Sequence, residues 1–157
     1  MPAETNRPTV RDATRADLEV IRAIVDETLF PGALLDEMIR PFFEDRDSEE
    51  FWLVSDDEGV TGVAYCVPEP MTEGTWNLRA IGVRPDRHRS GAGRALMAHV
   101  EDRLRRAGQR LLVVDTSSAP EQDGACAFYR GLGYLEESRI SGFWSAGEDK
   151  ITFTKQL

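Results

Sequence analysis

Residues 75–97 constrain the fold more than any other part of the chain, because a strand pattern, a basic turn and a helix pattern follow one another there. Alternate side chains in 75–83 share a face, as in an extended chain. Pro85 lacks an amide hydrogen and cannot continue a central strand, so we expect the strand to end near Val83 or Arg84. The apolar positions that follow have helical spacing: Leu96, Met97, Val100 and Leu104.

The turn between this strand and helix contains six consecutive residues suited to an anionic ligand: Arg89, Ser90, Gly91, Ala92, Gly93 and Arg94. The first four amide hydrogens of a helix are unpaired, and glycine lets a ligand approach the backbone closely. The helix dipole attracts negative charge, and Arg89 and Arg94 can add charge-assisted hydrogen bonds. The pattern indicates a phosphate or pyrophosphate site, and an ordinary turn with incidental arginines is the alternative.

Two other phosphate-binding loops fit this turn less well. A dinucleotide loop of the Rossmann type needs a third glycine three residues after the second, where this chain has Leu96. A Walker loop needs a lysine, and the only lysines of the chain are Lys150 and Lys155. A nucleotide-binding α/β protein is a rival hypothesis, which requires tight binding of NAD or ATP.

The turn and the residues before it resemble the coenzyme A loop of the GNAT N-acetyltransferase superfamily, whose pattern is Val-x-Pro followed by Gln/Arg-x-x-Gly-x-Gly/Ala. Val83-Arg84-Pro85 and Gly91-Ala92-Gly93 match, while His88 stands where Gln or Arg is usual. The resemblance implies that the loop binds the pyrophosphate of coenzyme A, with His88 as a further candidate contact. It also implies that the pantetheine amides bind to the end of the preceding strand, at the backbone of Ile81, Gly82 and Val83.

A second stretch, Gln122–Tyr134, resembles the other signature of the superfamily, Asn-x-x-Ala-x-x-Phe/Leu-Tyr-x-x-x-Gly-Phe/Tyr. Five positions are in register: Ala125, Phe128, Tyr129, Gly133 and Tyr134. The usual Asn is replaced by Gln122. The resemblance implies that Gln122 and Phe128 contact coenzyme A and that Tyr129 protonates the departing thiolate. A phenol suits that task because it keeps its proton at neutral pH, and a tyrosine of the core is the alternative.

The acceptor amine must lose a proton, so a base or an ordered water is needed. Some superfamily members have a glutamate six residues before the valine, where this chain has Asn77, which can hold a water but cannot take a proton. Glu73 and Asp115 are the acidic candidates nearby, and a turn carboxylate and a strand-end cap are their alternatives. Direct attack by an already neutral amine also stays open.

The acceptor pocket is expected among the first two helices and the 142–148 loop. Its candidate residues are aromatic, with simple packing as the alternative: Phe30, Phe42, Phe43, Phe143 and Trp144.

The order of elements resembles the GNAT fold over nearly the whole chain. Strands are expected at 9–11, 51–55, 60–67, 75–83, 110–116, 134–141 and 149–154, and helices at 14–29, 34–43, 91–107 and 121–132. This order implies an α/β fold with a mixed, mostly antiparallel central sheet of about seven strands, flanked by about four helices and splayed between the fourth and fifth strands. The apolar run Leu111–Val114 indicates a central strand covered on both faces. We expect residues 1–157 to form one domain.

Composition argues against several classes of function. The net charge of −9, from 28 acidic and 19 basic residues, disfavours binding to nucleic acid or anionic membranes. No apolar run approaches the roughly 20 residues that span a bilayer. The first seven residues lack the apolar core of a signal peptide, so we expect a cytoplasmic protein. Cys66 and Cys126 form no Cys-x-x-Cys pair, and we expect both to be buried, without a disulfide or a metal.

Together these features predict an acetyl-CoA-dependent N-acetyltransferase that moves an acetyl group to a primary amine of a small molecule, a peptide or a protein. Transfer is expected to be direct, in a ternary complex, since neither cysteine is placed as an acyl carrier. The rival is a non-catalytic domain that holds an acyl-CoA as a sensor or regulator. Dimers are common in the superfamily, so a homodimer is a further option.

Overall fold

The computed structural model describes residues 8–157. The expectation that the chain begins without a signal peptide concerns residues 1–7, which lie outside the described residues. The strands of the described chain are β1 (Thr9–Asp12), β2 (Phe51–Asp56), β3 (Val60–Pro68), β4 (Thr75–Val83), β5 (Leu111–Ser117), β6 (Leu135–Ser145) and β7 (Glu148–Gln156). The α-helices of these residues are α1 (Leu18–Thr28), α2 (Leu35–Glu44), α3 (Ala92–Arg106) and α4 (Asp123–Gly131). The predicted order of elements is confirmed.

The strands form one mixed sheet in the order β1-β2-β3-β4-β5-β7-β6. The β4–β5 pair is parallel, while β1–β2, β2–β3, β5–β7 and β6–β7 are antiparallel. Pairing between β4 and β5 covers only Thr75–Leu78 and Leu111–Val114. The remaining residues of the two strands are not paired with each other, which confirms the predicted splay.

The chain divides into two compact units. Among residues 8–157, the first contains those up to Val67 together with Ala80–Arg103, and the second contains Pro68–Arg79 and Leu104–Leu157. That residues 1–157 act as one domain stays a prediction.

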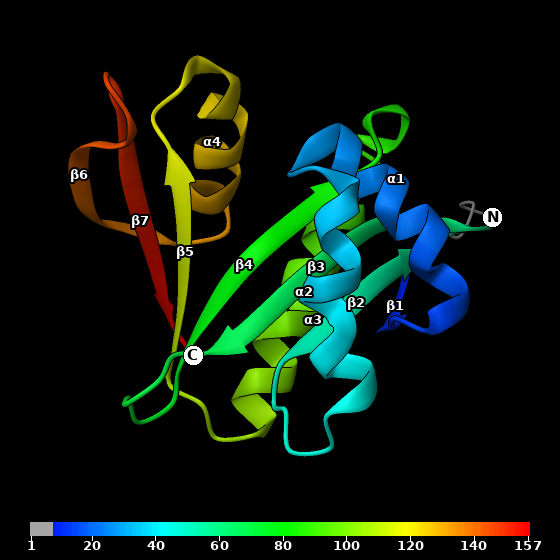
Figure 1. The fold of residues 1–157 in the computed structure, drawn as a ribbon. Coiled ribbons are helices and arrows are strands. Elements are labelled where there is room, and N and C mark those ends of the chain that lie inside the picture. Colours follow the sequence, from blue (N-terminus) through cyan, green and yellow to red (C-terminus); the bar gives the residue numbers. More distant parts are fainter. Residues whose placement is uncertain (1–7) are drawn as a thin grey trace, which may run out of the picture. The chain divides into compact units, whose positions relative to one another are not determined.

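In the first unit, helices cover both faces of β2 and β3 (Figure 1). Trp52 and Val54 alternate with residues of the other face and belong to one apolar cluster with α1 and α2. On the opposite face, α3 packs closely, because a Cβ atom on Gly62 would lie 3.1 Å from Cδ1 of Leu96. The apolar stripe of each helix is thus buried against one face of the sheet.

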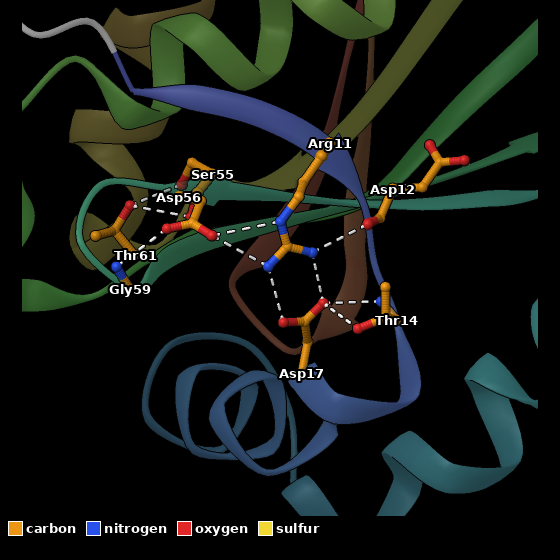
Figure 2. Close-up of polar contacts among 8 residues, drawn as sticks. All are labelled: Arg11, Asp12, Thr14, Asp17, Ser55, Asp56, Gly59 and Thr61. Atoms are coloured by element: carbon orange, nitrogen blue, oxygen red, sulfur yellow. Dashed lines mark hydrogen bonds and ion pairs between the residues drawn. The ribbon is translucent and has the colours of Figure 1, made fainter.

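The start of α1 is fixed by hydrogen bonds around Asp17 (Figure 2). The Thr14 amide and hydroxyl donate to Oδ2 of Asp17 at 2.8 and 3.0 Å, and the two residues form a capping box. Arg11 donates to both carboxylate oxygens of Asp17 at 2.7 and 2.9 Å and also contacts Asp56 at 3.2 Å. The Arg11 hydrogen bonds, with those from Thr14, lower the pKa of Asp17 to about 2. This network ties β1, β2 and the first turn of the helix together.

In the second unit, α4 packs its Cys126 and Tyr129 side against the sheet, and the ring centroids of Tyr129 and Phe153 are 5.6 Å apart. The expectation that β5 is buried on both faces is wrong for alternate residues. Leu112 and Val114 are buried, but Leu111 and Val113 are only half-buried. The second face of β5 adjoins polar threonines of β7, so the strand is apolar without being fully covered.

The C-terminal hairpin differs most from expectation. The predicted 142–148 loop is wrong, because β6 continues to Ser145 and only residues 146 and 147 form the turn. Gly147 has φ of 80°, which a tight hairpin turn requires. Every residue of β6 is exposed, and the strand lies at one edge of the sheet.

Both cysteines are buried, as predicted, and burial raises the pKa of the Cys66 thiol to about 12. No helix within residues 8–157 is long and apolar enough to cross a membrane.

Candidate active site

The turn before α3 presents backbone donors in the first unit. A 3-10 turn at Pro85–Arg87 leads into Arg89 with φ of 66° and Gly91 with φ of 88°. A positive φ is uncommon for a residue with a side chain and is found at ligand-binding turns. The Ala95 amide closes the first helical turn on the Gly91 carbonyl at 2.9 Å. Four amide groups of the turn have no hydrogen-bond partner among residues 8–157: those of Arg89, Gly91, Gly93 and Arg94.

Side-chain pairing separates the four arginines of residues 84–94 into two groups. Arg84 contacts Asp86 at 2.9 Å, and Arg87 contacts Asp57 at 3.4 Å. The exposed guanidinium groups of Arg89 and Arg94 form no ion pair within the described chain, so their charge remains available for an anion. Unpaired amides, the positive end of a helix and two uncompensated cations fit the pyrophosphate of coenzyme A.

His88 lies back against the end of β4 instead of extending from the turn. Its Nε2 is 3.0 Å from the Val83 carbonyl oxygen, and the N–H donates there when Nε2 carries the proton. One of the backbone groups expected to bind pantetheine therefore has a partner already. The phosphate contact of His88 and the pantetheine contacts of Val83 and the half-buried Ile81 stay predictions.

The structure explains the glycine at position 82 by a packing constraint that the sequence did not indicate. A Cβ atom at this position would lie 2.6 Å from Oγ1 of Thr28 and 3.0 Å from Cδ1 of Leu29. The end of α1 thus occupies the space that a side chain would need, and packing alone accounts for the glycine. Its role in cofactor binding stays a prediction.

The second unit contains a polar cluster built across three strands and a turn. The Asn77 side-chain amide of β4 donates to Oε1 of Glu69 at 2.9 Å and to Oδ2 of Asp115 at 3.4 Å. The other oxygen of Asp115 accepts the Thr152 hydroxyl at 2.7 Å, and the Lys150 ammonium lies 3.8 Å from Oδ2. One amide group thereby orients two carboxylates, and two residues of β7 hold one of them.

Of the predicted acid–base candidates, Asn77 and Asp115 belong to this cluster and Glu73 does not. Glu73 is exposed in the turn before β4, where its backbone carbonyl accepts Nε of Arg110 at 2.6 Å. The second carboxylate beside Asn77, next to that of Asp115, belongs to Glu69 and not to Glu73; sequence analysis missed it. The only available signal was its place in the Pro68-Glu69-Pro70 turn directly before the strand.

Tyr129 is enclosed by aromatic rings in the second unit. Its side chain is 5% exposed, with ring centroids 5.5 to 5.8 Å from those of Phe128, Tyr134 and Phe153. Its hydroxyl has no hydrogen-bond partner among residues 8–157, and burial raises the pKa of the phenol. Such a phenol keeps its proton and has it free to donate. Phe128 is half-buried, as is Gln122, which ends a 3-10 turn before α4.

The expected aromatic residues of the acceptor pocket fall into two groups. Phe30, Phe42 and Phe43 pack against the core of the first unit, which favours the packing alternative. Phe143 and Trp144 lie on β6, each about half exposed, in an edge-to-face pair with centroids 4.7 Å apart. The Trp144 indole N–H donates to the Thr116 carbonyl at 3.1 Å, which holds the pair over the end of β5.

A model of the acetyltransferase (GNAT) family matches residues 18–134. An amino-acid acetyltransferase from Ralstonia nicotianae is 30% identical over 117 residues, which cover 74% of this chain and 25% of that enzyme. The chain thus spans about a quarter of the length of this relative.

Two solved structures are similar over nearly their whole length. A Desulfovibrio desulfuricans protein described as a GNAT-family acetyltransferase has a TM-score of 0.87 at 29% identity, covering 95% of this chain and 98% of that chain. A Salmonella typhimurium protein solved with acetyl-CoA as its cofactor has a TM-score of 0.77 at 20% identity, covering 97% of this chain and 95% of that one.

Proposed function

The chain belongs to the acetyltransferase (GNAT) family, and from that membership we propose that it transfers the acetyl group of acetyl-CoA to a primary amine of a small molecule, a peptide or a protein. The observation that carries this proposal is the turn before α3, where unpaired amides meet the free charges of Arg89 and Arg94. The chain as a whole has a net charge of −9, so this cationic turn is the natural place for an anionic cofactor.

Transfer is direct in this proposal. An acyl-enzyme would need a reactive thiolate, and burial raises the pKa of Cys66 to about 12 and also raises that of Cys126. Acetyl-CoA supplies an activated thioester when bound. Arg89–Arg94 would hold its pyrophosphate, and the backbone at Ile81 and Val83 would align its pantetheine.

Tyr129 is the proposed proton donor. Its phenol stays protonated, and its hydroxyl is not committed to another residue of the described chain. A proton delivered to sulfur lets the thiolate leave as a thiol, and general acid catalysis of this kind contributes roughly 10²- to 10⁴-fold in rate.

Asp115, oriented by Asn77 and Thr152, is the proposed base for the amine. Asp115 and Thr152 share one face of β5 and β7, whereas Phe153, which contacts Tyr129, points to the other face. Acid and base therefore lie on opposite faces of the same strands. A thioester at the unpaired edge of β5 would have a proton acceptor on one side and a proton donor on the other.

The test combines binding with turnover. Calorimetry measures acetyl-CoA affinity, and thiol release reports transfer to a panel of primary amines that includes amino acids, polyamines and peptides with free N-termini. We expect binding, and turnover with at least one class of amine. Binding without any turnover would favour a sensor domain, and no binding would refute the proposal.

Tyr129→Phe tests the acid. The variant should lose roughly 10²-fold or more in kcat with little change in affinity for acetyl-CoA, because only the hydroxyl is removed. An unchanged kcat at every pH would remove Tyr129 from the mechanism. The described residues do not test a cytoplasmic location or a homodimer, and both stay predictions.

A further inference from the structure

Lys150 places a primary ammonium group inside the polar cluster of the second unit. Its Nζ lies 3.8 Å from Oδ2 of Asp115 and 4.5 Å from the ring centroid of Phe143, and the side chain is 22% exposed. A carboxylate on one side and an aromatic face on the other are the usual partners of an ammonium ion. The chain's own amine thus occupies a site whose chemistry suits an amine acceptor.

Three groups surround the Asp115 carboxylate, and the Lys150 ammonium is the most distant of them. Thr152 donates to Oδ1 at 2.7 Å, and Asn77 donates to Oδ2 at 3.4 Å, so the carboxylate is held from two sides. The Lys150 contact at 3.8 Å is longer than either and is made to Oδ2, the atom that would receive the proton of an acceptor. A side chain held in this way is restrained but not locked.

We propose that Lys150 is an acetylation site of this protein, modified in cis by its own active site. The proposal rests on the proposed function, since acetyl-CoA is the acyl donor. The ammonium group passes one proton to the Asp115 carboxylate, and the Nζ lone pair forms a bond to the thioester carbonyl carbon. The carbon–sulfur bond breaks, the sulfur takes a proton from Tyr129, and the second proton that the nitrogen loses restores the phenol. The products are Nζ-acetyl-lysine, free thiol and one proton released to solvent as the two side chains return to their starting states.

Lys155, the only other lysine, provides an internal reference. It lies on β7 five residues further on, an odd separation that places it on the opposite face of the strand from Lys150. Its Nζ donates to the Leu132 carbonyl at 2.9 Å. Acetylation that the active site directs should therefore select Lys150, whereas chemical acetylation by the reagent alone should not.

The experiment incubates the purified full-length chain with acetyl-CoA and follows intact mass and peptide masses over time. We expect one acetyl group on Lys150, formed roughly tenfold or more faster than on Lys155, a preference equivalent to about 1.4 kcal/mol of barrier. The first-order rate constant should not depend on protein concentration. Lys150→Arg should remove the modification, and Asp115→Asn and Tyr129→Phe should slow it at Lys150 without changing the rate at Lys155.

A reagent that lacks coenzyme A supplies a second readout. The N-hydroxysuccinimide ester of acetate should acetylate both lysines without preference for Lys150, because nothing positions that ester beside Asp115. Equal labelling of both lysines by acetyl-CoA, or the same selectivity with both donors, would overturn the inference. A rate constant that rises with protein concentration would overturn the transfer in cis.

Thiol release with the amine panel separates this inference from the proposed function. An enzyme that acetylates an added amine but not Lys150 would refute self-acetylation and leave the transferase assignment intact. A chain that neither binds acetyl-CoA nor releases thiol would refute both.

Discussion

The carboxylate of Asp17 gives the most direct quantitative prediction of this structure. Its side chain is 9% exposed and accepts hydrogen bonds from Arg11 and Thr14 (Figure 2), and its pKa is lowered from 3.8 to about 2. One pKa unit corresponds to about 1.4 kcal/mol, so the ionised carboxylate stabilises the folded state by about 2 kcal/mol at pH 7. Asp17→Asn should lower the free energy of unfolding by that amount, measured by urea denaturation.

The pH dependence tests the cause. Because the folded-state pKa of Asp17 is depressed, its contribution is complete above the unfolded value of 3.8 and is lost as the pH falls through about 2. The difference between the wild type and Asp17→Asn should therefore shrink to about 1 kcal/mol at pH 3.

Asp12→Asn is the matched control for this prediction. Asp12 pairs with Arg103 at 2.7 Å, but the two side chains are 56% and 39% exposed, and exposed pairs contribute at most about 1 kcal/mol. A difference between wild type and Asp17→Asn that stays constant from pH 7 to pH 3 would show that the charge of Asp17 is not the source. A control loss as large as that of Asp17→Asn would refute the role of burial.

Two further substitutions test packing and cofactor binding. Gly82→Ala should lower the free energy of unfolding by about 1–3 kcal/mol, because the new methyl group would meet Oγ1 of Thr28. Its control, Gly124→Ala in an open position of α4, should be neutral or stabilising by up to about 1 kcal/mol. Equal urea unfolding curves for the two variants would contradict the packing argument. Arg89→Gln should weaken acetyl-CoA binding by roughly tenfold, the effect of losing one charge-assisted hydrogen bond. Arg84→Gln should change the affinity little, because Arg84 already pairs with Asp86. Calorimetry in which both variants lose affinity equally would show that only net charge matters.

Local rules predicted much of the fold because the residues that carry them act over short distances. Pro85 ends β4 at Val83, two residues earlier, through its missing amide hydrogen alone. Thr14 and Asp17 are three residues apart and form their capping box within one turn. The helix after the glycine-rich turn begins at Ala92, one residue from its expected start.

The polar cluster depends on strand register and could not be predicted in the same way. Glu69 reaches Asn77 only because the turn folds back before β4, and Asp115 reaches it only because β4 and β5 pair with Asn77 opposite Val113. Neither the turn nor this register is encoded by spacing along the chain. Lys150 joins the cluster through the β5–β7 register for the same reason.

The length of β6 was predicted wrongly because glycine with positive φ occurs both in turns and within strands. Gly142 and Gly147 both have positive φ. The two glycines flank a run that contains Phe143 and Trp144, and the run was therefore predicted to be a loop. Only Gly147 lies in the turn, while Gly142 lies within β6, where the register with β7 shifts between Ile140 and Ser145. A strand with a bulge is hard to distinguish from a loop when only composition is available.

The exposed outer edge of β6 bears on self-association. An unpaired edge strand of this length invites pairing with a second chain, and proteins resist this with charged residues and interruptions in the ladder. Glu136, Glu137 and Arg139 supply the charge, and the two register shifts supply the interruptions. The register of β6 with β7 is regular only over Leu135–Glu136 and Ser138–Ile140. The outer edge of β6 therefore offers a neighbouring molecule only short regular stretches for strand addition, and β6 can stay open to solvent without driving the chain into fibres.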